Sequence, residues 1–158
     1  VGGGSFAPDE TLNRGMVVTV LYALEDAGAQ KTAGLFDDVA EDAWYAQGTA
    51  WAVEAGIVSG YGDGQFGPND AITREQMALM LYRYAQYMKL STGTGASLEA
   101  FGDEEEISSW AQQAMSWAVS AGILGGTPEG NLNPGGTATR AEAAVMVSQF
   151  VAWMLKSV

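Results

Sequence analysis

Two residue types are missing from this chain. Its 158 residues include no cysteine and no histidine. Without cysteine there can be no disulfide and no thiolate metal site. Without histidine the commonest general base and zinc ligand are absent, so no Cys/His or Ser/His catalytic pair is possible. Carboxylates are plentiful, but the sequence cannot place two of them at a glycosidase separation. We predict that the chain is not an enzyme and keep a glycan hydrolase as an alternative.

Basic residues are scarce. Seven lysines and arginines stand against nineteen aspartates and glutamates, giving a net charge of −12. Nucleic-acid binding requires a basic field, so we predict no nucleic-acid partner. The negative charge also disfavours binding of the chain to an anionic membrane surface. No apolar run approaches the ~20 residues of a membrane span, so we predict no membrane insertion. The 47% hydrophobic content suffices for a sizeable core.

Three segments of the chain resemble one another. In each, a proline is followed six residues later by an arginine, and the prolines Pro8, Pro68 and Pro134 lie 60 and 66 residues apart. The arginine opens an apolar pattern with helical spacing, which predicts helices over 14–27, 74–88 and 140–156. Each predicted helix has an N-cap residue directly before its arginine, and the second and third also have Gln or Glu at the third helical position, as in a capping box. The N-caps are Asn13, Thr73 and Thr139.

A second block occurs twice. An aspartate is followed by two tryptophans seven residues apart and then by glycine, which predicts helices over 44–55 and 109–121 with both indole rings on one face. The glycines suit the position just after a helix. We expect Trp51 and Trp117 in the core and Trp44 and Trp110 nearer a groove. The remaining members of the two blocks are Asp38, Gly56, Asp103 and Gly122.

A glycine-rich turn separates the two predicted helices of a repeat. Residues 2–6 match residues 62–66, so the chain is expected to begin inside the first repeat, without a tryptophan-bearing helix there. Its first residue is Val1 rather than Met, which suggests a processed or dissected precursor. We predict a single module over 1–158. It comprises a half repeat at 1–30, a repeat at 36–88, a linker at 89–100 and a repeat at 101–155.

These motifs together resemble the S-layer homology repeat. The resemblance rests on Phe36-Asp37-Asp38-Val39, Trp44-Tyr45, residues 52–57, residues 64–68 and Ile72-Thr73-Arg74-Glu75. It implies an all-α, pseudo-threefold assembly around a central helical bundle. It also implies an extracellular module at the bacterial cell surface. Such a module binds the secondary cell-wall polymer, or a peptidoglycan-linked glycan, of Gram-positive-type cells non-covalently, often through a pyruvylated amino sugar.

The resemblance also implies a set of glycan-binding residues. In the family, the arginine of the Thr-Arg-Ala-Glu motif binds the acidic sugar in grooves between repeats. Arg74 and Arg140 match that motif well, whereas Arg14 lies between Asn13 and Gly15 instead of Thr and Ala. The third repeat also departs, with Leu132 in place of the aromatic residue. The full set of candidates is Arg14, Arg74, Arg140, Gly60, Gly62, Asp63, Gly126, Trp44 and Trp110.

Elementary physical chemistry supports an anion site at these arginines. Position N1 of a helix offers unpaired N–H groups and the positive end of the dipole. A guanidinium group adds a planar fork that can hold a carboxylate in two hydrogen bonds. The structural alternative is that each arginine pairs with an acid of a neighbouring repeat and holds the repeats together.

Two further hypotheses concern a metal site and a protein partner. Asp63 and Asp70 lie in a stretch that faintly resembles a calcium loop, but the alternating acidic ligands are missing and the positions do not recur, so we predict no metal site and no cofactor. The half repeat motivates an alternative function. The chain would then be a protein-interaction module, completed by a helical partner segment or a second copy in a homo-oligomer.

Overall fold

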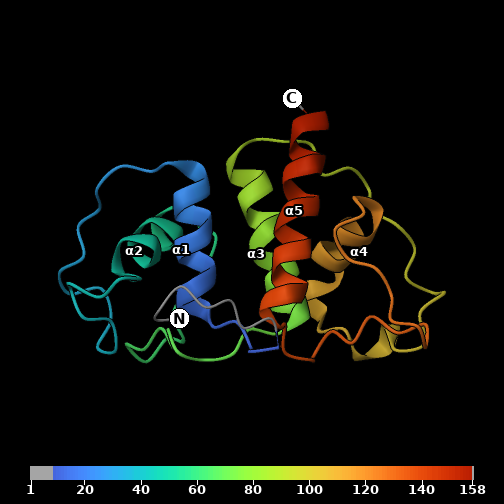
Figure 1. Cartoon of the computed structure of the whole chain (residues 1–158), viewed down its shortest axis with the longest axis horizontal. Coiled ribbons are helices and arrows are strands. Elements are labelled where there is room, and N and C mark those ends of the chain that lie inside the picture. The colour runs from blue at the N-terminus through green and yellow to red at the C-terminus, as the bar shows by residue number, and fades with distance from the viewer. Residues whose placement is uncertain (1–8, 158) are drawn as a thin grey trace. The chain divides into compact units, whose positions relative to one another are not determined.

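The computed structural model describes residues 9–157. These contain five α-helices, two short 3₁₀ helices and no strand, only isolated β-bridges (Figure 1). The predicted all-α class is therefore confirmed, while the pseudo-threefold arrangement around a central bundle stays a prediction. Residues 2–6, on which the first repeat's turn was predicted, lie outside the described part. The helices are α1 (Arg14–Glu25), α2 (Ala46–Glu54), α3 (Arg74–Tyr87), η2 (Glu104–Glu106), η3 (Ser109–Ala111), α4 (Gln112–Ser120) and α5 (Arg140–Lys156).

The three arginine-bearing helices start where their caps predict. The side chain of Asn13 accepts a hydrogen bond from the N–H of Met16 at 2.8 Å. In α3 and α5 both halves of the capping box form, with Thr73 and Thr139 as N-caps. Each cap satisfies amide groups that have no partner inside the helix. The sequence thus locates all three helix starts to the residue.

The two tryptophan-bearing helices end alike. Gly56 and Gly122 adopt φ of +75°, a conformation that costs glycine little. In the first case the N–H of Ile57 donates to Ala52 O at 2.9 Å, and the N–H of Gly56 donates to Val53 O at 3.1 Å. This pair of bonds is the Schellman motif. The predicted role of both glycines is confirmed.

The starts of these two helices differ from the prediction. Trp44 lies in the turn before α2, and Trp110 lies in η3 before α4. Trp44 is 60% exposed, whereas Trp51 is 5% exposed. The two rings of each pair therefore do not share one helix face, and that prediction was wrong. The reason is that the chain becomes α-helical only after the first tryptophan.

The described chain divides into two compact units. The first unit is residues 12–71, and the second is residues 9–11 with 72–157. The boundary between the two units falls inside the predicted repeat 36–88. The reason is that helices of successive repeats pack together, α1 against α2 and α3 against α4. The repeat boundaries themselves stay a prediction.

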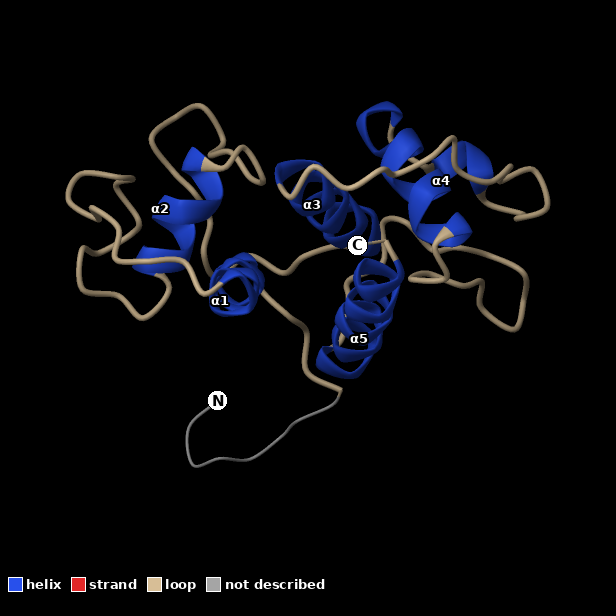
Figure 2. Ribbon diagram, turned by 90° about the horizontal axis from the view of Figure 1, so that it is seen from above, coloured by secondary structure: helices blue, strands red, loops and turns tan. Residues whose placement is uncertain are grey.

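Each unit has its own core. In the first unit, Val18, Leu21 and Trp51 are buried between α1 and α2. In the second unit, α3 packs against both α4 and α5 (Figure 2). There the ring of Trp117 lies 5.5 Å from that of Tyr82 and 6.2 Å from that of Phe150. The expected burial of Trp51 and Trp117 is confirmed.

None of the described helices is both long enough and apolar enough to cross a bilayer.

Candidate functional site

In the first unit, Arg14 and Asp38 bind the same residue, Phe66. The Asp38 carboxylate accepts from the N–H groups of Phe66 and Gly67, each at 2.8 Å. The Arg14 Nε donates to the carbonyl oxygen of Phe66 at 3.0 Å. Asp38 thus fixes the loop after the glycine-rich turn, and Arg14 anchors that loop to the start of α1.

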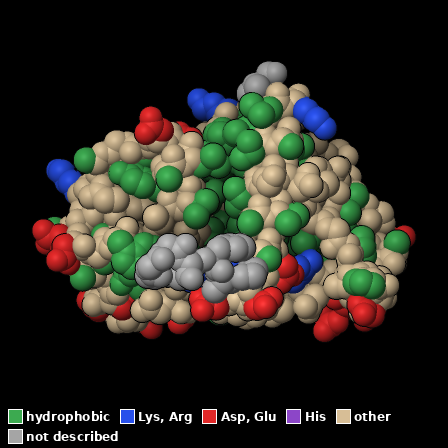
Figure 3. Space-filling model, in the orientation of Figure 1, with side chains coloured by type: hydrophobic (Ala, Val, Ile, Leu, Met, Phe, Trp, Pro, Cys, Tyr) green, Lys and Arg blue, Asp and Glu red, His purple; other side chains and the backbone are tan. Residues whose placement is uncertain are grey.

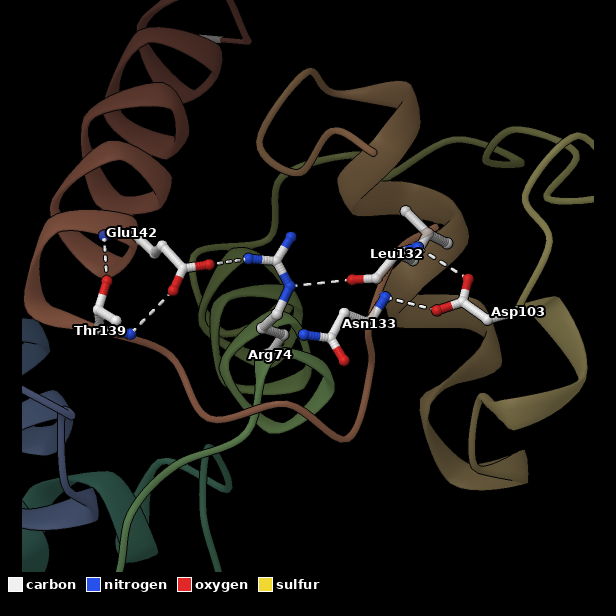
Figure 4. Close-up of polar contacts among 6 residues, drawn as sticks. All are labelled: Arg74, Asp103, Leu132, Asn133, Thr139 and Glu142. Carbon is white, nitrogen blue, oxygen red and sulfur yellow. Dashed lines mark hydrogen bonds and ion pairs between the residues drawn. The ribbon is translucent and has the colours of Figure 1, made fainter. Parts of the chain in front are cut away.

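The second unit repeats this arrangement at equivalent positions (Figure 4). The Asp103 carboxylate accepts from the N–H groups of Leu132 at 2.8 Å and Asn133 at 2.6 Å. The Arg74 Nε donates to the carbonyl oxygen of Leu132 at 2.9 Å. These hydrogen bonds use only backbone atoms of the loop residue, so Leu132 can replace the aromatic Phe66 without losing them.

The backbone amides of the three N1 arginines are already paired. The N–H of Arg14 donates to Asp70 O at 3.0 Å, that of Arg74 to Gly136 O at 2.9 Å, and that of Arg140 to Glu10 O at 2.8 Å. Each acceptor lies two residues after a motif proline. The next amide is also used in α1 and α3, where it donates to Pro68 O and Pro134 O. An anion at these helix starts would therefore be held by side chains rather than by these N–H groups.

The guanidinium groups have different surroundings. Arg14 donates from Nη2 to Ser59 O at 2.8 Å, and its Cζ lies 5.0 Å and 4.5 Å from the ring centroids of Tyr61 and Phe66. Arg74 forms an ion pair through Nη1 with Glu142 of α5 (Figure 4). The structural alternative, an arginine paired with an acid of another repeat, is therefore realised at Arg74.

Arg140 is the third case. Its Nη2 lies 3.3 Å from the Glu10 carboxylate, which is 61% exposed. The Arg140 side chain is 13% exposed, and Arg14 and Arg74 are each 8% exposed as whole residues. All three arginines therefore reach solvent only at an edge. Among the described residues, Arg14 alone of the three has no ion pair with a carboxylate.

Tyr61 is a neighbour of Arg14 that the sequence reasoning did not select. Its hydroxyl donates to Asp70 Oδ2 at 2.6 Å, and half of the residue is exposed. Desolvation raises the pKa of the Tyr61 phenol, and the hydrogen bond to Asp70 raises it further, while the charge of Arg14 opposes the shift. The available signal was its place beside Gly60 in the glycine-rich turn; the matching residue of the last repeat is Thr127.

The glycine candidates have structural reasons of their own. A Cβ at Gly60 would collide with the Phe36 ring, and one at Gly126 would meet the Phe101 ring at 2.8 Å. These two glycines therefore leave room for equivalent aromatic rings. Gly62 has φ of +88° and no atom near its virtual Cβ.

Asp63 stabilises its own turn. Its Oδ1 accepts from the N–H of Gln65 at 3.0 Å. Among the described residues, no group of three or more acidic side chains is placed to hold a metal ion.

The two exposed tryptophans lie in segments that are anchored beside an arginine. Trp44 packs edge-on against Tyr45 at 5.0 Å, and a Cβ at Gly15 would lie 3.2 Å from the Tyr45 ring. Trp110 is 51% exposed and follows Ser108 closely.

Ser108 provides the matching anchor in the second unit. Its N–H and hydroxyl donate to the buried Glu75 carboxylate at 2.9 and 2.6 Å. Gly15 and Glu75 each directly follow a motif arginine. The fold thus ties the exposed tryptophan and the arginine of each unit to adjoining positions.

The sequence of this chain is similar to those of several known proteins. The family model of the S-layer homology domain matches residues 35–78 and 100–144. A surface-layer 125 kDa protein of Lysinibacillus sphaericus is 31% identical over 151 residues, 94% of this chain and 12% of that protein. An S-layer protein of Bacillus thuringiensis subsp. finitimus is 31% identical over 146 residues, 92% of this chain and 17% of that protein. An amylopullulanase of Thermoanaerobacterium thermosulfurigenes is 32% identical over 142 residues, 90% of this chain and 8% of that protein. The chain therefore spans only 8–17% of the length of these relatives.

Proposed function

We propose that this chain, which belongs to the S-layer homology domain family, is a non-catalytic module. It attaches to the bacterial cell wall from outside the cell. Relatives named as surface-layer proteins support this location. The amylopullulanase relative is named as an enzyme, but the chain matches only 8% of its length. That small share is consistent with a module that binds while catalysis resides elsewhere in that relative.

The proposed ligand is an acidic secondary cell-wall polysaccharide carrying a carboxylate, such as a pyruvylated amino sugar. The observation that supports it is the placement of scarce cations. Three of seven basic residues occupy one repeated position on a chain of net charge −12. On the face that Figure 3 shows, basic side chains occur singly among acidic and neutral ones. An acidic polymer would be repelled at long range, so binding relies on short-range contacts and tolerates salt.

The arginine geometry suits carboxylate capture. Because Nε of Arg14 and of Arg74 is bound to a loop carbonyl, the guanidinium plane is fixed before a ligand arrives. A group held in advance loses little side-chain entropy on binding. At Arg74 and Arg140 a ligand carboxylate would compete with Glu142 and Glu10.

We therefore place the strongest carboxylate contact at Arg14, which has no such competitor among the described residues. The exposed rings of Trp44 and Trp110 would stack on sugar faces. The turn residues Gly60, Gly62, Asp63 and Gly126 would let the glycan approach the backbone.

Retention on purified wall polymer tests the arginine roles. The variants are Arg14→Ala, Arg74→Ala and Arg140→Ala, each first checked for helical content by circular dichroism. Arg83→Ala is the matched control, because Arg83 lies on α3 outside the motif and its loss changes the net charge equally. We expect each motif variant to be retained less than the control, and Arg14→Ala least of all. Equal retention of all four variants would rule out the arginine mechanism.

A second candidate function is protein interaction, and exposed apolar residues of α5 favour it. Val145 is 57% exposed and Leu155 is 66% exposed. Apolar surface of this kind commonly marks a partner site. Size-exclusion chromatography with light scattering tests self-association. A concentration-dependent dimer that Val145→Lys abolishes supports a homo-oligomer, and a monomer at all concentrations argues against it.

A further inference from the structure

A turn around a motif proline wraps the arginine of each unit. In the first unit, Arg14 donates from Nε to Phe66 O at 3.0 Å and from its backbone N–H to Asp70 O at 3.0 Å. In the second unit, residues 132–136 wrap Arg74 through the same two kinds of bond, at both ends of the turn. The side chains that these turns carry are therefore held beside the arginine.

The two turns have the same backbone conformation. The N–H of Asp70 donates to Gly67 O at 3.1 Å, and the N–H of Gly136 donates to Asn133 O at 3.2 Å. Gly67 and Asn133 both have positive φ, of +73° and +51°. Asparagine is among the few residues besides glycine that adopt this conformation readily. The turns therefore differ in their side chains and not in their path.

In the first unit, the space inside the turn is filled by the side chain of its last residue. A Cβ at Gly67 would collide with the Asp70 carboxylate and with the Tyr61 hydroxyl. That hydroxyl donates to Asp70 Oδ2 at 2.6 Å, and the Tyr61 ring lies 5.0 Å from Arg14 Cζ. Asp70 is exposed, and among the described residues none donates to its other oxygen. That oxygen can accept a hydrogen bond from a ligand beside Arg14.

In the second unit, the same space is filled from the opposite end of the turn. A Cβ at Gly136 would collide with the amide group of Asn133. Asn133 is exposed, and Figure 4 shows its amide group next to the Arg74 side chain. Each turn thus has room for one side chain beside its arginine. That side chain ends in a carboxylate in the first unit and in a carboxamide in the second.

The two groups differ in what they can bind. A carboxylate only accepts hydrogen bonds, whereas a carboxamide both donates and accepts them. A ligand that places its own carboxylate on Arg14 must therefore offer a hydrogen-bond donor to Asp70. A ligand on Arg74 needs no such donor, because the amide group of Asn133 can donate to it instead.

We propose that this one side chain determines which sugars each arginine site accepts. The inference rests on the proposed function and specifies its ligand. At Arg14, Asp70 accepts from a sugar hydroxyl while the guanidinium holds the ligand carboxylate. A sugar without that hydroxyl leaves the Asp70 oxygen desolvated and without a partner, which weakens binding. At Arg74, Asn133 makes the site tolerant of the same loss.

The test compares two small probes, a pyruvylated hexose and its O-methylated form, which has no hydrogen-bond donor. Both are titrated into the full chain, and binding is followed by NMR at the Nε–H groups of Arg14 and Arg74. Each of these groups is bound to a loop carbonyl, so each reports on its own site. We expect methylation to weaken binding at Arg14 by about tenfold, and at Arg74 by less than about threefold.

Exchanging the side chains between the turns should exchange this selectivity. Gly67→Asn combined with Asp70→Gly should reduce the effect of methylation at Arg14 to less than about threefold. Asn133→Gly combined with Gly136→Asp should bring the larger effect to Arg74. Asp26→Asn is the matched control for the lost charge, because Asp26 is exposed at the far end of α1 from Arg14. It should leave both sites unchanged.

A second measurement needs no ligand. Gly67→Asn alone should lower the melting temperature, because two side chains then compete for one space. Adding Asp70→Gly should recover most of that loss. Melting temperatures that show no such recovery would contradict the shared space and overturn the inference.

Two further outcomes separate this inference from the proposed function. Equal effects of methylation at both arginines, or an effect at Arg14 that survives the exchange, would overturn the selectivity and leave the carboxylate site standing. If neither sugar shifts either arginine signal, the proposed arginine sites and the inference fail together.

Discussion

Asp103 and Arg74 hold one residue, Leu132, from opposite sides. The carboxylate accepts from its N–H at 2.8 Å, and the guanidinium Nε donates to its carbonyl at 2.9 Å. Asp38 and Arg14 do the same at Phe66. The repeated acid and the repeated arginine therefore act together on the loop backbone. The arginine is held rigid by this contact, and in the proposed function the same rigidity favours its binding of an external carboxylate.

The first prediction concerns the acid of this arrangement. Asp103→Asn keeps the shape, but its amide group presents a donor to one of two backbone N–H groups. We expect the free energy of unfolding to fall by about 1–3 kcal/mol. Urea denaturation measures it. Asp63→Asn is the control, since Asp63 is exposed and accepts only within its own turn. An Asp103→Asn variant as stable as this control would contradict the described role.

The second prediction separates binding from stability at the exposed tryptophans. Trp44→Ala and Trp110→Ala should change the free energy of unfolding by no more than about 0.5 kcal/mol, because both rings are largely exposed. Retention on wall polymer should nonetheless fall. Trp117→Ala should cost about 3–5 kcal/mol, because it empties a buried site. Unchanged retention of both surface variants would remove the tryptophans from the proposed site.

The third prediction concerns alkaline pH and Tyr61. Its pKa is raised above the ordinary value, chiefly by desolvation and then by the hydrogen bond to Asp70. A raised pKa in the folded state means that the stabilising contribution is complete below about pH 10. It is lost as pH rises further, while the folded-state phenol ionises. Tyr61→Phe should therefore show a smaller loss of melting temperature than wild type above that pH, and identical slopes would contradict the assignment.

The fourth prediction tests the close approach of α1 and α2. Gly48→Val places branched carbon atoms where a Cβ alone would lie 2.8 Å from Val18 O. Overpacking of this kind costs about 1–3 kcal/mol. The melting temperature should fall accordingly. Gly28→Val is the control, because no atom lies near the virtual Cβ of Gly28. Equal melting temperatures for the two variants would show that α1 and α2 are not so closely packed.

Local signals predicted much of the secondary structure. The capping residues Asn13, Thr73 and Thr139 fixed three helix starts, since their side chains satisfy amides within three residues. Gly56 and Gly122 fixed two helix ends for a similarly local reason. The start of α2 was misplaced, because tryptophan spacing alone does not show where helical backbone begins.

The surroundings of the arginines could not be predicted. Glu142 pairs with Arg74 across 68 residues, and no local pattern specifies such a contact. The same holds for Ser59, whose carbonyl accepts from Arg14. The sequence ranked Arg14 below the others from its flanking residues. In the structure, the three arginines differ instead in whether a described acidic side chain forms an ion pair with them.

Calorimetric titration of the chain with purified secondary cell-wall polymer, before and after chemical removal of its acidic substituents, tests whether the chain binds the polymer through its carboxylates. We expect saturable binding to the intact polymer that persists at raised salt, and loss of that binding once the carboxylates are removed. Equal heats for both polymers, or no heat with the intact one, would contradict it.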